Sequence, residues 1–169
     1  MNAHAASEHF LDLYERAFQD VYSYVASRLI DRGEAEDVTQ EVFVAGARHA
    51  AAGGDVDVAW LKTVARNKLV DHWRARARED RKLALAYSAE SAPMVDGYQP
   101  VGAEWVAQVL AGLNPTYRAA LVLRHVDGLS VPEVATLLDR TVEATEQVLS
   151  RARAAFRIAY AIASGATNA

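Results

Sequence analysis

Apolar residues recur at intervals of three and four positions along the first half of the chain, the spacing that gathers side chains on one face of an α-helix. The first stripe comprises Phe10, Leu13, Tyr14, Ala17, Phe18, Val21 and Val25. A break at 31–33 and the pair Gly53-Gly54 divide the next part of the chain. A second helix is therefore predicted from about Glu34 to Ala50, and a third is predicted to open near Asp57.

The third predicted helix has an apolar face and a cationic face. Its inner stripe comprises Leu61, Val64, Ala65 and Leu69, and its outer face carries Lys62, Thr63, Arg66, Asn67 and Arg74. After Glu79 the periodicity fades, and Pro93, Asp96-Gly97 and Pro100 are typical helix breakers. Residues 79–103 are therefore predicted to form a flexible linker between two domains.

The second half of the chain carries clear helix start and stop signals. Asn114 followed by Pro115 is a strong N-terminal signal, and Gly128 is a matching stop, so a helix is predicted from Pro115 to about Val126.

Two further capping signals lie in the same half. Ser130 and Glu133 have the spacing of a capping box ahead of a short helix, and Thr141 can cap a longer last helix. A short helix, a tight turn and a longer helix form a candidate helix-turn-helix. Because no strand-like alternation stands out, the predicted fold is all-α, with two small helical domains joined by the linker.

Charge is segregated along the chain, although the formal net charge is only -4. From Glu8 to Arg48 nine acidic residues stand against four arginines, whereas from Lys62 to Lys82 eight basic residues outnumber three acidic ones. An acidic module joined to a basic helix indicates two partners, one cationic and one polyanionic. Solvated helix faces of different composition are the alternative interpretation.

Composition and motifs exclude several classes of function. Cysteine is absent, and the five histidines show no metal-ligand spacing. Neither a nucleophile elbow nor a phosphate-binding loop is present. We therefore expect no enzymatic activity, no catalytic residues, no cofactor and no metal. No apolar run reaches the roughly 18 residues of a membrane span, and no signal peptide is evident, so a cytoplasmic protein without membrane insertion is expected.

Two polar surfaces are the candidate functional sites. Asp37, Gln40 and Glu41 are spaced to project from one helical face and form an acidic, hydrogen-bonding patch. The basic helix carries cations that can neutralise phosphates, with Trp60 and Trp73 close by to stack on unpaired bases. Each surface also has a purely structural interpretation, as a solvated flank or as the exterior of a packed helix.

Four sequence runs in order resemble the extracytoplasmic-function sigma factors of the sigma-70 superfamily. They are EAEDVTQEVF at 34–43, AWLKTVARNKLVDHWR at 59–74, LNPTYRAALVLRHVDGLSVPEVATLL at 113–138 and LSRARAAFR at 149–157. The resemblance implies a sigma factor that binds core RNA polymerase and directs promoter-specific transcription initiation. It implies domain 2 at 8–78, the linker at 79–103 and domain 4 at 104–161.

The resemblance also implies where the polymerase binds. In that family the face matching Asp37, Gln40 and Glu41, with Phe43 beside it, docks on the clamp helices of the largest subunit. The segment from Leu113 to Arg124 corresponds to the part that meets the flap. The polymerase-contacting residues it implies there are Leu121 and Arg124. Whether an anti-sigma factor also binds the chain is left open.

Promoter contacts are implied for both domains. The loop at 50–57 and the following helix would capture flipped-out bases of the -10 element, and the helix-turn-helix would read the -35 element. The DNA-binding residues implied for the first domain are Lys62, Arg66, Asn67, Asp71, His72 and Arg74. Those implied for the recognition helix are Glu143, Ala144, Gln147, Val148 and Arg151.

Four positions depart from the family pattern. The recognition helix carries Glu143 and Glu146 where a basic or small polar face is usual, Arg140 stands where a buried aliphatic residue is usual, and Lys68 interrupts the apolar stripe. Two rival functions stay open. One is an ordinary helix-turn-helix regulator, and the other is a module that binds polymerase or an anti-sigma partner and reads little DNA itself.

Overall fold

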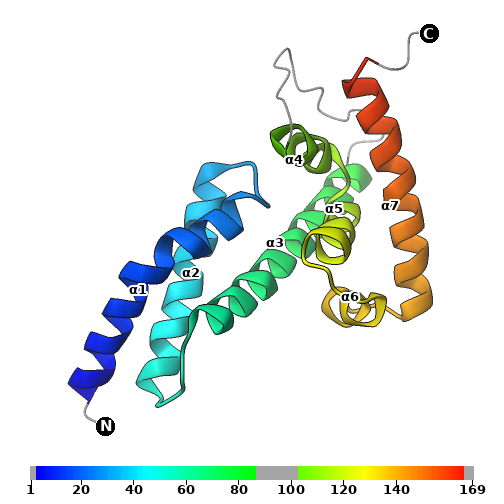
Figure 1. The fold of residues 1–169 in the computed structure, drawn as a ribbon. Coiled ribbons are helices and arrows are strands. Elements are labelled where there is room, and N and C mark those ends of the chain that lie inside the picture. Colours follow the sequence, from blue (N-terminus) through cyan, green and yellow to red (C-terminus); the bar gives the residue numbers. More distant parts are fainter. Residues whose placement is uncertain (1–2, 87–102, 166–169) are drawn as a thin grey trace. The chain divides into compact units, whose positions relative to one another are not determined.

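Helices are the only regular elements in the ranges that the computed structural model describes, residues 3–86 and 103–165, and no strand occurs there (Figure 1). The all-α prediction is confirmed. The chain divides into two compact units, Met1–Leu69 and Val70–Ala169, and the division falls inside the third helix.

The first unit is built on two packed helices, α1 (Ala3–Ala26) and α2 (Arg32–Ala51) (Figure 1). The predicted stripe of α1 is confirmed for Leu13, Ala17, Val21 and Val25, which are buried, whereas Tyr14 of the same stripe is exposed. The buried face of α2 comprises Ala35, Val38, Thr39, Val42, Phe43 and Gly46. Thr39 is tolerated in this core because its hydroxyl donates to the carbonyl of Ala35, at 2.7 Å.

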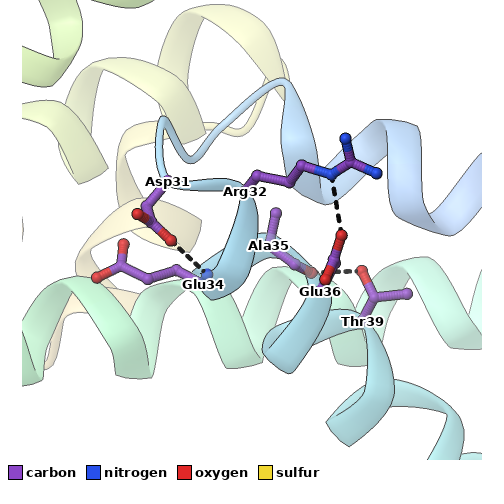
Figure 2. Close-up of polar contacts among 6 residues, drawn as sticks. All are labelled: Asp31, Arg32, Glu34, Ala35, Glu36 and Thr39. Carbon is purple, nitrogen blue, oxygen red and sulfur yellow. Dashed lines mark hydrogen bonds and ion pairs between the residues drawn. The ribbon is translucent and has the colours of Figure 1, made fainter.

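The first turn of α2 begins earlier than the sequence pattern predicts. Asp31 is the N-cap, and its carboxylate accepts from the backbone N–H of Glu34 at 2.8 Å (Figure 2). Arg32 and Gly33 are therefore helical and not part of the break. Arg32 Nε donates to Glu36 Oε1 at 3.0 Å, and this hydrogen bond raises the pKa of the Arg32 guanidinium above its ordinary value.

Three helices converge on Gly46 in the middle of α2. A Cβ at this position would lie 3.0 Å from a ring carbon of Phe10 on α1 and 3.0 Å from Cδ2 of Leu61 on the third helix. These separations are tighter than ordinary van der Waals contact, so only glycine gives the approach without displacing a neighbour.

The third helix, α3 (Val58–Ala86), is longer than predicted. Asp57 caps it by accepting from the backbone N–H of Trp60 at 2.7 Å. The helix continues past Arg78, where the first domain was expected to end, into the segment assigned to the linker. Its last residues, RKLALA, are strong helix formers, so propensity extends the helix although the apolar stripe has ended. The rest of the predicted linker, 87–102, lies outside the described residues.

The second unit contains the predicted helices with their predicted caps. They are α4 (Ala103–Gly112), α5 (Pro115–Leu121), α6 (Val131–Leu138) and α7 (Val142–Ala163) (Figure 1). The side chain of Asn114 accepts from the N–H of Thr116 at 2.9 Å. Ser130 and Glu133 form the capping box, and Thr141 caps α7.

The helix predicted from Pro115 to Val126 is α-helical in its first half and π-helical in its second half. After α5 the chain forms a π-helical turn, Val122–Val126, which ends with the Asp127 N–H on the Val122 carbonyl at 2.9 Å. Gly128 then takes a positive φ of 71°, which confirms the predicted stop. Leu113, Leu121 and Ala152 form a buried cluster that joins this segment to α7.

We predict that Gly46→Val lowers the free energy of unfolding of the first unit by about 1–3 kcal/mol, because the added methyl groups overlap Phe10 and Leu61. Ala47→Val is the matched control: it places the same side chain on the exposed neighbour, where only helix propensity changes, by at most about 0.7 kcal/mol. Thermal denaturation followed by circular dichroism measures both. Equal stability of the two variants would contradict the packing argument.

Candidate interaction surfaces

The predicted acidic patch is exposed on the side of α2 away from its buried face. Asp37, Gln40 and Glu41 are all exposed. They line an open depression together with Val44, Arg48 and Lys68. The surface therefore combines carboxylates, an amide and an apolar contact with two cations at its edge, a mixture suited to a charged protein partner.

Lys68 of α3 explains one departure from the apolar stripe. Its Nζ lies 2.9 Å from Oε2 of Glu41, with side chains 36% and 59% exposed. A pair this exposed contributes about 0–1 kcal/mol, so it can exchange for an intermolecular pair at small cost. A lysine within an apolar stripe indicates that an anionic residue lies close by. The sequence alone does not identify this residue as Glu41, because the pairing depends on how α2 and α3 pack.

Phe43, predicted to lie beside the patch as a polymerase contact, is buried with 5% of its surface exposed. Its ring packs edge-on against Tyr14 at 4.7 Å between centroids and lies 5.9 Å from Phe18. The side chain therefore holds α1 against α2 and is not on the surface that carries Asp37.

The connection between α2 and α3 is closed by backbone hydrogen bonds. The N–H groups of Gly53 and Gly54 donate to the carbonyls of Ala50 and His49, each at 2.9 Å. Gly53 takes a positive φ of 83°. A Cβ on Gly54 would overlap the imidazole ring of His49, so the two glycines serve different purposes.

His49 also stacks on Trp60, with 4.7 Å between ring centroids and 15° between planes. The stack ties the last turn of α2 to the first turn of α3. Val56 of the same loop is buried. The loop predicted to receive flipped-out bases is thus held in one conformation, with one face of the Trp60 ring covered. Trp73, the other aromatic residue proposed for stacking, is buried.

The predicted DNA-binding residues of α3 do not all share one face. Asn67, Asp71 and Arg74 follow each other at intervals of four and three residues and form one face; the first two are exposed and Arg74 is half-buried. Lys62 and Arg66 are half-buried and lie about 140° and 100° round the helix from Asn67, so they belong to a different side. His72 is half-buried and lies about 140° round the helix from Asn67, so it belongs to another side.

The predicted recognition helix, α7, presents an acidic start. Glu143, Gln147 and Arg151 are exposed at intervals of four residues and form one face, and Glu146 is exposed beside them. Ala144 and Val148 are half-buried, so only part of each side chain is accessible.

Arg140, the other departure in this domain, is exposed in the turn between α6 and α7. Its N–H donates to the Ala135 carbonyl at 3.0 Å, after Asp139 takes the left-handed conformation at φ 53°. The turn therefore needs the backbone of residue 140 and does not bury its side chain.

Both residues predicted to meet the flap make contacts within the second unit. Leu121 is buried in the cluster with Leu113 and Ala152, so its side chain is not on the surface. Arg124 is half-buried, and its Nη1 donates to the Leu129 carbonyl at 2.9 Å, which fixes the connection between α5 and α6.

Within the described ranges, no group of three or more His, Cys, Asp and Glu side chains could hold a metal ion. The same ranges contain no helix long and apolar enough to cross a membrane.

Comparison with protein families identifies one family region in each half of the chain. Residues 13–79 match the family "Sigma-70 region 2", and residues 103–156 match "Sigma-70, region 4". The chain is 32% identical over 161 residues to the ECF RNA polymerase sigma factor SigK of Mycobacterium ulcerans, covering 88% of this chain and 82% of that one.

Two further comparisons agree. The chain is 29% identical over 148 residues to the ECF RNA polymerase sigma factor BldN of Streptomyces coelicolor, covering 83% of this chain but only 56% of BldN. The fold is similar to that of the sigma factor RpoE in its complex with the anti-sigma factor NepR from Bartonella quintana. That similarity has a TM-score of 0.54 at 21% identity and covers 90% of this chain and 96% of RpoE.

We predict that His49→Ala loosens the α2–α3 loop. An aromatic pair contributes about 0.5–1.5 kcal/mol, so the amides of Gly53 and Gly54 should exchange hydrogen roughly twofold to tenfold faster. His49→Phe keeps a ring on Trp60 and is the matched control. Hydrogen exchange read by NMR distinguishes them, and unchanged exchange in His49→Ala would mean that the stack does not hold the loop.

Proposed function

The chain belongs to the extracytoplasmic-function family of sigma-70 RNA polymerase sigma factors, and from this membership we propose that it binds core RNA polymerase, recognises and melts the -10 region, and places its second domain near the -35 element. The observation that supports the proposal is the pairing of both family regions, in order, with an exposed acidic face on α2 and the cations Lys62, Arg66 and Arg74 on α3. The coarser conclusion, a transcription factor and not an enzyme, follows from the same membership.

The polymerase-binding surface in this proposal is the depression on α2. Asp37, Gln40 and Glu41 would meet cationic groups on the clamp helices of the largest subunit, and Glu41 would exchange Lys68 for an intermolecular partner. Phe43 would contribute indirectly, because its buried ring holds α2 against α1. The flap contact is proposed for the segment 113–124 as a surface, with Leu121 and Arg124 shaping it from within.

The promoter-melting surface is proposed to comprise the outer face of α3 and the loop at 52–57. Asn67 can hydrogen-bond an exposed base edge, and Lys62, Arg66 and Arg74 can neutralise phosphates of the melted strand. The loop supports this role because it is held by the His49 stack before any strand arrives, which lowers the ordering cost of binding.

One observation favours a second candidate function. Glu143 and Glu146 bring negative charge to the start of α7, where phosphate neutralisation would otherwise supply affinity. The second domain would then act chiefly through the polymerase and read little sequence, with Arg151 and Gln147 as its remaining DNA contacts. Because RpoE, which shares this fold, is bound by the anti-sigma factor NepR, an anti-sigma partner is part of the proposal.

We predict that Asp37→Lys/Glu41→Lys weakens binding to core polymerase more than tenfold, because it reverses two charges on the proposed docking face and replaces the anionic partner of Lys68 with a second cation. Helix content should stay nearly unchanged, since exposed substitutions usually cost within about 0.5 kcal/mol. Asp12→Lys/Asp20→Lys makes the same change of charge on exposed positions of α1. Equal losses from the two pairs, measured by titration with labelled core enzyme, would show a general charge effect and no specific patch.

Promoter choice should depend mainly on the first domain. In run-off transcription with purified core polymerase, scrambling the -10 region should abolish initiation, whereas scrambling the -35 region should reduce it only a few-fold, because good base contacts discriminate by about 1–3 kcal/mol each and α7 offers few. A large loss from the -35 scramble, matched by the same loss in Gln147→Ala, would show that α7 reads DNA. Absence of any promoter-specific product would refute the proposed function as a whole.

A further inference from the structure

Four arginines line one depression of the second unit, Val70–Ala169. They are Arg74, Arg78 and Arg81 of α3 and Arg140, which follows the end of α6. Residues at the start of α5 complete the wall. The depression has a volume of about 350 Å³, at the lower end of the range of about 300–1,000 Å³ that small-molecule sites occupy. It is therefore large enough for a small ligand.

The floor of this depression is apolar. It is formed by four buried side chains: Trp73, Ala77, Ala119 and Leu138. Trp73 and Ala77 lie one turn apart on α3, and an arginine directly follows each of them, so α3 supplies floor and rim in two adjacent rows. Charges held over a floor that excludes water interact more strongly than charges on an isolated helix.

The rim has an excess of positive charge. Asp139 is the one carboxylate among the described residues that line the depression, so four guanidinium groups against one carboxylate leave three positive charges. Asp139 Oδ2 lies 3.5 Å from Arg74 Nη2, and the Asp139 side chain is 84% exposed. A pair this long and this exposed contributes little, so Arg74 can exchange Asp139 for another anion at small cost.

The remaining arginines have donors to spare. Arg81 uses its Nε for the Ala77 carbonyl, at 3.1 Å, and keeps its terminal nitrogens. In the part of the chain that the structure describes, no side chain or carbonyl accepts a hydrogen bond from the guanidinium of Arg78 or of Arg140. Arg78 stands one helical turn from Arg74, where like charges repel each other. An anion bound between the arginines would relieve this repulsion.

We propose that the depression binds the diphosphate group of a small molecule, either inorganic pyrophosphate or the diphosphate of a nucleotide. One phosphate monoester carries about 1.5–2 negative charges at pH 7, so three positive charges call for a second phosphate group. The planar fork of an arginine donates two parallel hydrogen bonds to phosphate oxygens, which a lysine does not do. The site is a property of the chain alone, whether or not the chain binds polymerase.

Isothermal titration calorimetry of the full chain in magnesium-free buffer tests the proposal, with pyrophosphate, ADP and orthophosphate as probes. We expect saturable binding of pyrophosphate or ADP, roughly tenfold or more tighter than that of orthophosphate, because a single phosphate engages fewer arginines. Tighter binding of ADP than of pyrophosphate would assign the site to a nucleotide. Equal or weaker binding of ADP would assign it to pyrophosphate.

Arg78→Ala/Arg140→Ala should weaken binding roughly tenfold or more, because it removes two of the four forks. Arg153→Ala/Arg157→Ala is the matched control, since it makes the same change of charge on exposed positions of α7, and its affinity should be unchanged. Arg78→Lys/Arg140→Lys keeps the charge and loses the forks, so we expect an intermediate loss. This variant also retains the test if the alanine pair fails to fold, which circular dichroism shows.

Tryptophan fluorescence locates the ligand. The chain has three tryptophans, and Trp60→Phe/Trp105→Phe leaves Trp73 alone while keeping a ring against His49 and Tyr160. Emission from Trp73 should change with the same midpoint as the heat of binding, because this side chain lies in the floor.

Four results would overturn the proposal. They are the absence of saturable binding of both diphosphates, equally tight binding of orthophosphate, equal losses in the two alanine pairs, and binding that leaves the emission of Trp73 unchanged. Failure of the proposed function is a separate outcome, because these measurements involve neither polymerase nor DNA.

Discussion

The approach of three helices at Gly46 is the constraint on which the first domain depends. A ring carbon of Phe10 and Cδ2 of Leu61 would both lie 3.0 Å from a side-chain carbon at this position, so α1 and α3 contact the same side of α2. With that side occupied, the opposite side is left to solvent, and it carries Asp37 and Glu41. Because Gly46 has no side chain, α1 and α3 can pack closely on this side of α2. The polar residues on the opposite side therefore stay accessible to a partner.

In the second domain, local capping determines the geometry and leaves the exposed face free to vary. Ser130 and Glu133 satisfy the first turn of α6, Asp139 ends it in the left-handed conformation, and Thr141 starts α7. Asp is among the few residues other than Gly that visit this conformation readily. None of these groups lies on the face of Gln147. The helix-turn-helix therefore persists whatever charge that face carries, and its presence alone says little about how well it reads DNA.

Local signals made most of the helices predictable. Stripes at helical spacing identified α1 and the start of α3, and the breaks at 31–33 and Gly53-Gly54 delimited α2. The Asn114-Pro115 and Ser130-Glu133 signals identified the caps of the second domain. The residues of the acidic patch followed from spacing alone, because three positions on one turn project together in any helix.

The features that could not be predicted depend on tertiary neighbours or on competing propensities. Phe43 was placed on the polymerase-binding face by the family resemblance alone, but the rings of α1 bury it. Leu121 is buried because α7 returns against α5, a contact between residues far apart in sequence. The extension of α3 to Ala86 had no apolar stripe to reveal it, since helix propensity alone sustains it. The partner of Lys68 needed the relative placement of two helices.

One small domain can present opposite charges to two partners because salt limits the reach of each surface. Lys68 contacts Glu41 of the acidic patch and lies ten residues before Arg78, about 15 Å along α3. The screening length is about 8 Å at physiological ionic strength, so the acidic patch and the cations of α3 near Arg78 influence each other little. Net charge is then a poor guide to partners, and an overall charge of -4 is compatible with tight DNA binding. At ionic strength near 0.01 M the screening length grows to about 30 Å, and the acidic patch would oppose the approach of a polyanion to these cations.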